Sequence, residues 1–118
     1  MLLLHMHQYT GIVEGGGKLA TRLGFPTANI PLADDFVSGI YAARARVLDK
    51  EYESVVYANQ RRKLLEVHLL NFSGDLYGTK LNVVLLKKIR EDTEFSDEHI
   101  ARIAISDDVM RVRAYFKS

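Results

Sequence analysis

The sequence predicts an all-β fold with one C-terminal helix, in which short strands form a small antiparallel barrel. Three observations support this prediction. Runs with the alternation or composition of strands recur through the middle of the chain, turn residues separate them at close intervals, and the C-terminal residues change to a helical period. A parallel sheet would need a crossover helix between its strands, and no such helical segment is visible in the sequence.

Five segments show the alternation or the β-branched composition of strands. In residues 39–48, small apolar side chains alternate with Arg44 and Arg46, which is typical of a half-buried strand. In residues 81–89 the inward-facing side chains are expected to be Leu81, Val83, Leu85 and Ile89. The remaining predicted strands are residues 9–13, 53–58 and 63–70.

The C-terminal segment predicts an amphipathic helix over residues 97–115. Ser96 is a favourable N-cap, and Asp97 and Glu98 place negative charge in the first turn, where it suits the helix dipole. Apolar residues then recur at intervals of four, three and four positions: Ile105, Val109, Val112 and Phe116. The expected architecture is therefore a barrel closed or flanked by this helix.

Length and composition limit the possible classes of protein. A chain of 118 residues suits one compact domain, expected over residues 1–118. A formal net charge of +1 gives no support to a nucleic-acid partner or a polybasic membrane surface. The chain has no cysteine, which excludes disulfides and thiolate nucleophiles. No apolar run approaches the roughly 20 residues of a membrane span, so we expect a cytoplasmic protein, and a monomer.

A glycine run, Gly15, Gly16 and Gly17, is the first candidate for a binding function. Glycine allows backbone N–H groups to approach phosphate oxygens closely and to form an anion-binding concavity. The run matches neither the P-loop nor the dinucleotide-binding fingerprint. A plain hairpin loop is the alternative interpretation.

The segment after Pro26 is the second candidate, because proline restricts the backbone there. In an extended chain Thr27 and Asn29 project from the same face. Two neutral oxygens on one rigid face can complete the shell of a Mg²⁺ ion that also takes water and phosphate oxygens. The alternative is a turn in which both side chains bond to their own backbone.

Glu66 is the third candidate, since it lies in the middle of a mostly apolar predicted strand. We expect Glu66 and His68 to share one face of that strand, opposite Leu65, Val67 and Leu69. If that face lines a cavity, Glu66 is a candidate general base. The alternative is a solvent-exposed strand face.

The order of these motifs is more specific than any of them alone. The relevant stretches are Leu23-Gly24-Phe25-Pro26-Thr27-Ala28-Asn29-Ile30, Ser38-Gly39-Ile40-Tyr41-Ala42, Glu66-Val67-His68-Leu69-Leu70-Asn71-Phe72-Ser73-Gly74-Asp75-Leu76-Tyr77-Gly78, Ile89-Arg90 and Phe95. In this order, over about residues 9–110, the chain resembles the ATP-dependent riboflavin kinase (flavokinase) family. The resemblance implies a six-stranded antiparallel Greek-key barrel with one flanking helix. It also implies transfer of the ATP γ-phosphoryl group to the 5′-hydroxyl of riboflavin, which gives FMN and ADP.

The resemblance further implies roles for individual residues. Glu66 matches the family's catalytic base, and Thr27 and Asn29 match its metal-binding positions, with Mg²⁺ as the implied ion. Arg90 and Phe95 match positions near the flavin. The positions that match the nucleotide-binding set are Gly15, Gly16, Gly17, Thr21, Arg22, Thr27, Leu69, Asn71 and Tyr77.

Two departures from the family pattern leave other functions open. Many bacterial members have Gly-Arg where this chain has Ala20-Thr21-Arg22, and their longer connection before Glu66 is reduced here to residues 58–62. The first alternative is therefore a flavin- or nucleotide-binding module without kinase activity. The second is a small β-barrel interaction domain, in which the glycine run and Glu66 face solvent separately. A kinase site instead requires Glu66 and Thr27 to face one cavity.

Overall fold

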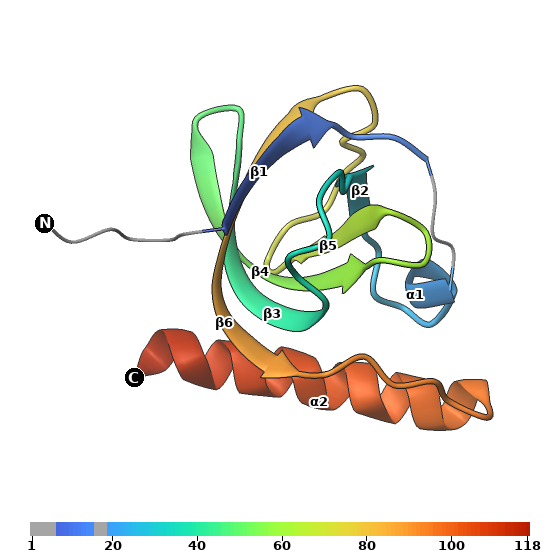
Figure 1. The fold of residues 1–118 in the computed structure, drawn as a ribbon. Coiled ribbons are helices and arrows are strands. Elements are labelled where there is room, and N and C mark those ends of the chain that lie inside the picture. The colour runs from blue at the N-terminus through green and yellow to red at the C-terminus, as the bar shows by residue number, and fades with distance from the viewer. Residues whose placement is uncertain (1–6, 16–18) are drawn as a thin grey trace, which may run out of the picture.

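The computed structural model describes residues 7–15 and 19–118, which form a curved sheet and two helices (Figure 1). The predicted barrel and C-terminal helix are both confirmed. The elements in chain order are β1 (His7–Ile12), α1 (Leu19–Arg22), β2 (Ala28–Pro31), β3 (Gly39–Val47), β4 (Lys50–Asn59), β5 (Leu64–Leu69), β6 (Lys80–Arg90) and α2 (Glu98–Lys117).

The six strands form one antiparallel sheet in the order β1-β6-β3-β4-β5-β2. Strands β3, β4 and β5 follow one another, and β6 returns to lie beside β3, which is the Greek-key arrangement. The two edge strands meet where the N–H of Glu14 donates to the carbonyl of Asn29 at 2.8 Å. This contact nearly closes the sheet into a barrel.

A tight turn and a short helix were missed by the sequence prediction. Leu48 and Asp49 both have positive φ (51° and 69°) and form the tight turn between β3 and β4. As a result β4 begins at Lys50, earlier than the predicted start at residue 53. The short helix α1, Leu19–Arg22, follows the glycine run and was also not predicted.

The barrel core contains the alternating side chains that the sequence predicted for it, with one exception. Leu81, Val83 and Leu85 point inward, whereas Ile89 packs outside the barrel in the cluster under α2. The reason is an irregular register between β3 and β6, with shifts at Ala42/Ala43 and Ile40/Tyr41. The expectation that Ile89 faces the barrel interior was therefore wrong.

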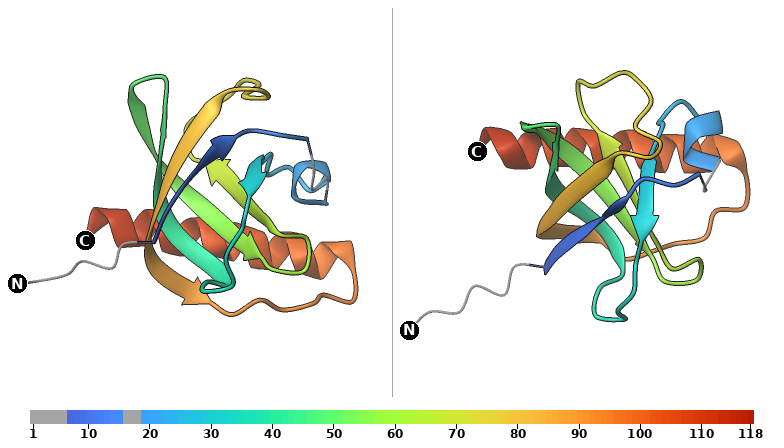
Figure 2. Two further views of the ribbon diagram at one scale, coloured as in Figure 1. Left: turned by 45° about the horizontal axis from the view of Figure 1, so that its top comes forward. Right: turned by 90° about the horizontal axis from the view of Figure 1, so that it is seen from above.

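Helix α2 lies across the outside of the barrel, as Figure 2 shows in two further views. Val112, on this helix, is fully buried against the outer faces of β3 and β4. The N-cap is Asp97, whose carboxylate accepts from the N–H of Ile100 at 2.9 Å, so the predicted cap at Ser96 was one residue early. Neither of the helices in the described ranges is long and apolar enough to cross a membrane.

Candidate active site

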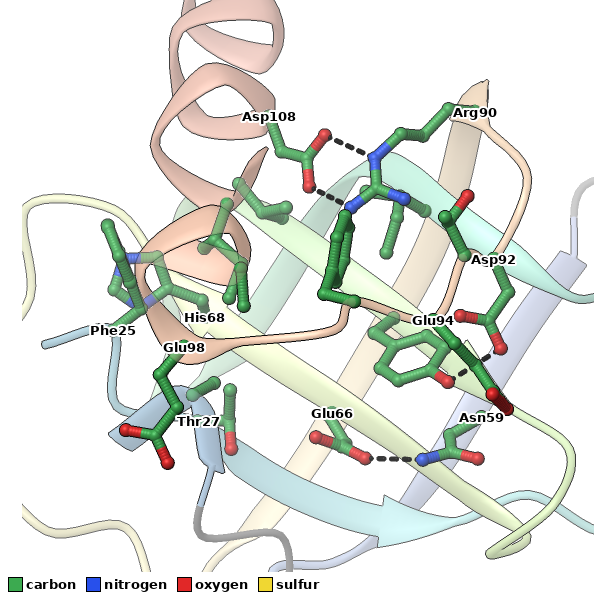
Figure 3. Close-up of a pocket in the computed structure, with 18 of the residues that line it drawn as sticks. Phe25, Thr27, Asn59, Glu66, His68, Arg90, Asp92, Glu94, Glu98 and Asp108 are labelled. Atoms are coloured by element: carbon green, nitrogen blue, oxygen red, sulfur yellow. Dashed lines mark hydrogen bonds and ion pairs between the residues drawn. The ribbon is translucent and has the colours of Figure 1, made fainter. Parts of the chain in front are cut away.

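A cleft of about 670 Å³ lies on the outside of the barrel, between the outer faces of β4 and β5, helix α2, and the segment 91–97 (Figure 3). Four of the predicted site residues line this one cleft. They come from the residue before β2, from β5, from the end of β6 and from the segment before α2: Thr27, Glu66, Arg90 and Phe95. The requirement that Glu66 and Thr27 face one cavity is therefore met.

The alternation of β5 places Glu66 in the cleft. Leu65 and Val67 are buried inside the barrel, so the side chain between them points to the outer face. Glu66 is only 8% exposed, and its Oε2 accepts a hydrogen bond of 2.9 Å from Nδ2 of Asn59. A carboxylate that is buried and bonded is not a solvated strand decoration, so that alternative was wrong.

The side-chain oxygens of Thr27 and Asn29 are buried and have no hydrogen-bond partner among residues 7–15 and 19–118. Such atoms are rare in folded proteins, because losing water without a replacement partner is unfavourable. Neither oxygen bonds to its own backbone, so the turn interpretation of this segment was wrong. Asn29 is the register partner of Glu66 in the neighbouring strand, and Thr27 lines the cleft.

His68 holds the Thr27 segment in place. Its Nδ1 lies 2.7 Å from the carbonyl oxygen of Pro26, and because a carbonyl only accepts, this nitrogen is the donor. The His68 ring also meets the ring of Phe25 edge-on at 5.7 Å between centroids. These contacts tie the end of β5 to the chain that leads into β2.

Arg90 and Asp108 form an ion pair at the other end of the cleft. Nε and Nη2 of Arg90 each donate to Asp108 at 2.8 Å, and Asp108 is 2% exposed. These hydrogen bonds raise the pKa of the Arg90 guanidinium, so Arg90 stays charged. The guanidinium carbon also lies 5.5 Å from the ring centre of Phe95. Asp108 therefore fixes both side chains.

Sequence reasoning missed Asp108, although a signal was present. The predicted apolar stripe of the helix contains Ile105, Val109 and Val112, and position 108 falls on the same stripe at helical spacing. A carboxylate on the buried face of an amphipathic helix requires a cationic partner. That partner is Arg90.

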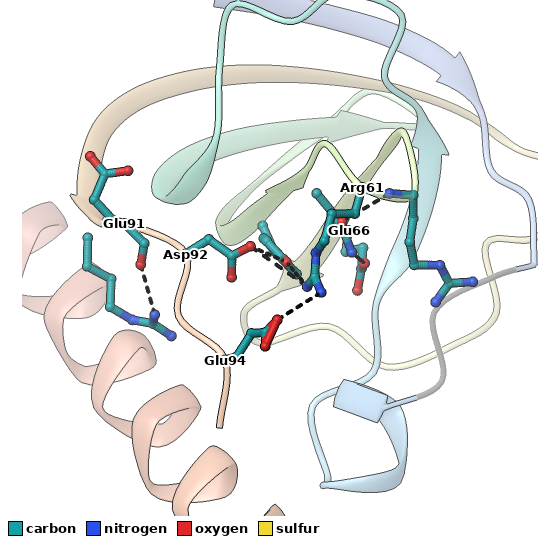
Figure 4. A network of polar contacts seen from close by, with 9 residues as sticks. Arg61, Glu66, Glu91, Asp92 and Glu94 are labelled. Carbon is teal, nitrogen blue, oxygen red and sulfur yellow. Dashed lines mark hydrogen bonds and ion pairs between the residues drawn. The ribbon is translucent and has the colours of Figure 1, made fainter. Parts of the chain in front are cut away.

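A second group of charges joins the two walls of the cleft (Figure 4). Nη2 of Arg61 donates to the hydroxyl of Tyr57 at 3.1 Å, and its guanidinium lies 3.8 Å from Asp92 and 3.7 Å from Glu94. The Tyr57 hydroxyl donates to Asp92 at 2.7 Å. Burial, together with the bond to Asp92, raises the pKa of Tyr57, so its hydroxyl remains a donor. Arg61 thus links the turn between β4 and β5 to the segment 91–97.

The other predicted nucleotide residues that the structure describes do not line this cleft. Leu69 packs in the barrel core, and Asn71 and Tyr77 are exposed in the connection between β5 and β6. Gly15, Thr21 and Arg22 are exposed, and Arg22 pairs with Glu98 of α2. Gly16 and Gly17 lie outside the described residues.

The cleft brings together a buried carboxylate, the unpaired Thr27 oxygen and several cations. Phosphoryl-transfer enzymes use such groups, because that chemistry depends on positioning and charge neutralisation. The family comparison is more specific. The model of the flavokinase family, described as riboflavin kinase, matches residues 3–116. The chain therefore belongs to this family.

Known proteins agree with this assignment. The chain is 37% identical to the bifunctional riboflavin kinase/FMN adenylyltransferase of Escherichia coli K12, over 98% of this chain and 40% of that protein. It spans about two fifths of the length of the curated relatives it matches.

Two solved structures share the fold at 23% identity. The riboflavin kinase of Trypanosoma brucei has a TM-score of 0.69, covering 94% of this chain and 80% of that one. A Streptococcus pneumoniae structure titled as a macrolide-efflux protein has a TM-score of 0.78, covering 90% and 38%. At this identity both show similarity of fold alone.

Proposed function

We propose that this domain transfers the γ-phosphoryl group of ATP to the 5′-hydroxyl of riboflavin, with Glu66 as the general base. The observation that carries the proposal is that a buried carboxylate and an unpaired Thr27 oxygen line the same cleft. Membership of the riboflavin kinase family supports the same reaction.

The composition of the cleft suits a flavin at the end that α2 covers. Apolar side chains from the sheet face apolar side chains from the helix across this end: Ile40, Val55, Ala101, Ile105 and Val109. Tyr57 and Phe95 add aromatic rings, on which a flat ring system can stack. A riboflavin ring bound here directs its ribityl chain along the outer face of β5 toward Glu66. Arg90 and Phe95 are then the flavin-contacting residues.

The residues at the other end fit a Mg²⁺ ion. Mg²⁺ is bound through oxygen and usually keeps several waters, so a site with few protein ligands is sufficient. The Thr27 and Asn29 side-chain oxygens are buried and unpaired, which leaves both able to coordinate. When bound, the ion would supply positive charge that offsets the negative charge of the ATP phosphates.

In the reaction Glu66 accepts the proton of the riboflavin 5′-hydroxyl. The hydroxyl oxygen then forms a bond to the γ-phosphorus while the bond from that phosphorus to the β–γ bridging oxygen breaks, which releases ADP. A positioned base of this kind contributes about 10²- to 10⁴-fold to the rate. The cleft provides the remaining catalysis by holding both substrates in line and by limiting the access of water.

We further propose that ATP lies beside β2, next to the segment that follows β1. The N–H of Gly78 donates to the carbonyl of Val13 at 2.9 Å, so the Tyr77 connection lies next to the start of the glycine run. This proximity supports a nucleotide site made of Gly15, Gly16, Gly17, Thr21, Arg22, Thr27, Leu69, Asn71 and Tyr77. Because the Leu69 side chain packs in the core, its contact would be through the backbone.

The test is to incubate the purified protein with riboflavin, ATP and Mg²⁺ and to separate the flavins by chromatography. We expect FMN and ADP to form in equal amounts. Binding of riboflavin, seen as quenching of its fluorescence, without any FMN would instead favour the binding module. The cytoplasmic location and the monomeric state remain predictions, and size-exclusion chromatography of the same preparation tests the second.

A further inference from the structure

We propose that Asn59 is a positioning residue that orients the carboxylate of Glu66 for proton transfer; this inference rests on the proposed kinase function. Asn59 is the last residue of β4 and is 4% exposed. Its Nδ2 donates to Oε2 of Glu66 at 2.9 Å, and both side chains line the cleft.

The strand register explains how the two side chains meet. The residue opposite Glu66 on β4 is Tyr57, and Asn59 lies two positions further along the same outer face. Side chains in this diagonal relation are within reach of each other when one is long. The contact therefore depends on the antiparallel pairing of β4 and β5, and a slip of one residue would place Asn59 on the opposite face.

The hydrogen bond leaves one carboxylate oxygen for chemistry. Among the described residues, Oε1 of Glu66 has no hydrogen-bond partner, and Figure 3 shows it directed toward Thr27, away from Asn59. A glutamate side chain has three rotatable bonds, so without a partner its carboxylate would sample several orientations. Donation from Asn59 holds Oε2 and presents Oε1 to the end of the cleft where the proposed phosphoryl transfer occurs.

Asn59 makes a second contact that must be separated from the first. Its Oδ1 accepts from the backbone N–H of Arg62 at 3.2 Å and so closes the turn between β4 and β5. The amide thus combines an acceptor for the turn with a donor for the base. Aspartate and serine keep an acceptor near the turn, but aspartate has no donor when ionised and serine is too short to reach Glu66. Both substitutions separate the two contacts.

The experiment compares steady-state kinetics of Asn59→Asp and Asn59→Ser with the wild-type protein. We expect kcat to fall about 10- to 100-fold, while the KM values for riboflavin and ATP change by less than about threefold. The reason is that Asn59 is proposed to orient Glu66 and not to bind either substrate. Circular dichroism and thermal unfolding show whether each variant is folded. If the aspartate variant does not fold, the neutral serine variant carries the test.

The matched controls are Asn82→Asp and Asn82→Ser. Asn82 lies on β6, away from the cleft, where its Oδ1 accepts from the hydroxyl of Thr10. These substitutions make the same changes in charge and size, and we expect wild-type kcat from both. They separate the effect at Asn59 from a general effect of altering a strand asparagine.

A swap variant separates orientation of the base from stability. In Asn59→Asp combined with Glu66→Gln, the glutamine amide can donate to the new carboxylate, so the hydrogen bond re-forms with its direction reversed. We expect the melting temperature to return toward the wild-type value, while kcat stays as low as in Glu66→Gln alone.

Three results would overturn the inference. A wild-type kcat in a folded Asn59 variant would show that Asn59 does not position Glu66. The proposed kinase function would still stand in that case, provided that the wild-type protein forms FMN. A raised riboflavin KM with unchanged kcat would make Asn59 a binding residue. If the wild-type protein forms no FMN, the proposed function and this inference fail together.

Discussion

The two faces of strand β5 have opposite properties, although their residues alternate along the chain. Leu65 and Val67 are fully buried among aliphatic side chains inside the barrel. Glu66, between them, faces a cleft whose walls carry ion pairs and the unpaired oxygen of Thr27. The inner face thus supplies stability through apolar burial, whereas the outer face holds polar groups in positions that suit the proposed catalysis.

Helix α2 shows the same division on a single face. Val112 packs against the outer surface of the sheet, and Asp108, one turn earlier, is equally buried but pairs with Arg90. The apolar contact holds the helix on the barrel. The ion pair fixes the end of β6 and the Phe95 segment that lines the cleft.

The largest expected effect comes from Glu66→Gln, which keeps the shape of the side chain and removes its basicity. We expect kcat to fall by about 10²- to 10⁴-fold with little change in riboflavin affinity and in the melting temperature. Glu51→Gln, on the exposed part of β4, is the control and should retain full activity. Near-normal turnover would remove Glu66 from the mechanism.

Breaking the buried ion pair should cause the next largest effect. Asp108→Ala leaves Arg90 without its partner, and we expect the free energy of unfolding to fall by about 3–5 kcal/mol in urea titrations. Asp107→Ala is the matched control. The Asp107 carboxylate is exposed and lies 4.0 Å from Arg111, and an exposed ion pair of this kind contributes less than about 1 kcal/mol to stability. Equal losses at both positions would show that the buried pair has no special role.

Leu65→Ala tests the inner face of β5 directly next to Glu66. Removing a fully buried leucine side chain should lower the free energy of unfolding by about 2–5 kcal/mol. The kcat per folded molecule should stay near the wild-type value, because the side chain does not reach the cleft. A strong loss of kcat in folded protein would contradict the separation of the two faces.

The smallest effect is expected for Thr27→Ala combined with Asn29→Ala. Because both oxygens are unpaired, we expect stability to change by less than about 1 kcal/mol. Affinity for a non-hydrolysable ATP analogue should fall at least about tenfold in the presence of Mg²⁺, measured by calorimetry. The same titration without Mg²⁺ is the control, and an equal loss there would show that the two residues do not act through the metal.

Much of this architecture could be predicted from local pattern. Alternation identified the inner and outer faces of residues 39–48 and 63–70, and helical spacing identified α2. The order of short motifs implied the Greek-key barrel. It also led to the prediction that Thr27 and Glu66 face the same cavity. Strand β2, with only four residues, has no period long enough to detect, and the sequence analysis treated its segment as a rigid extended stretch.

What the sequence by itself determined is therefore which side of each strand or helix a residue occupies, because side-chain direction follows from the backbone period. Only the tertiary structure decided which outward-facing residues meet. Asn59 reaches Glu66 through strand register, and Arg90 reaches Asp108 through the packing of α2 on the barrel. The irregular register that turns Ile89 outward is likewise invisible to periodicity, since it arises from the fit between two strands far apart in the chain.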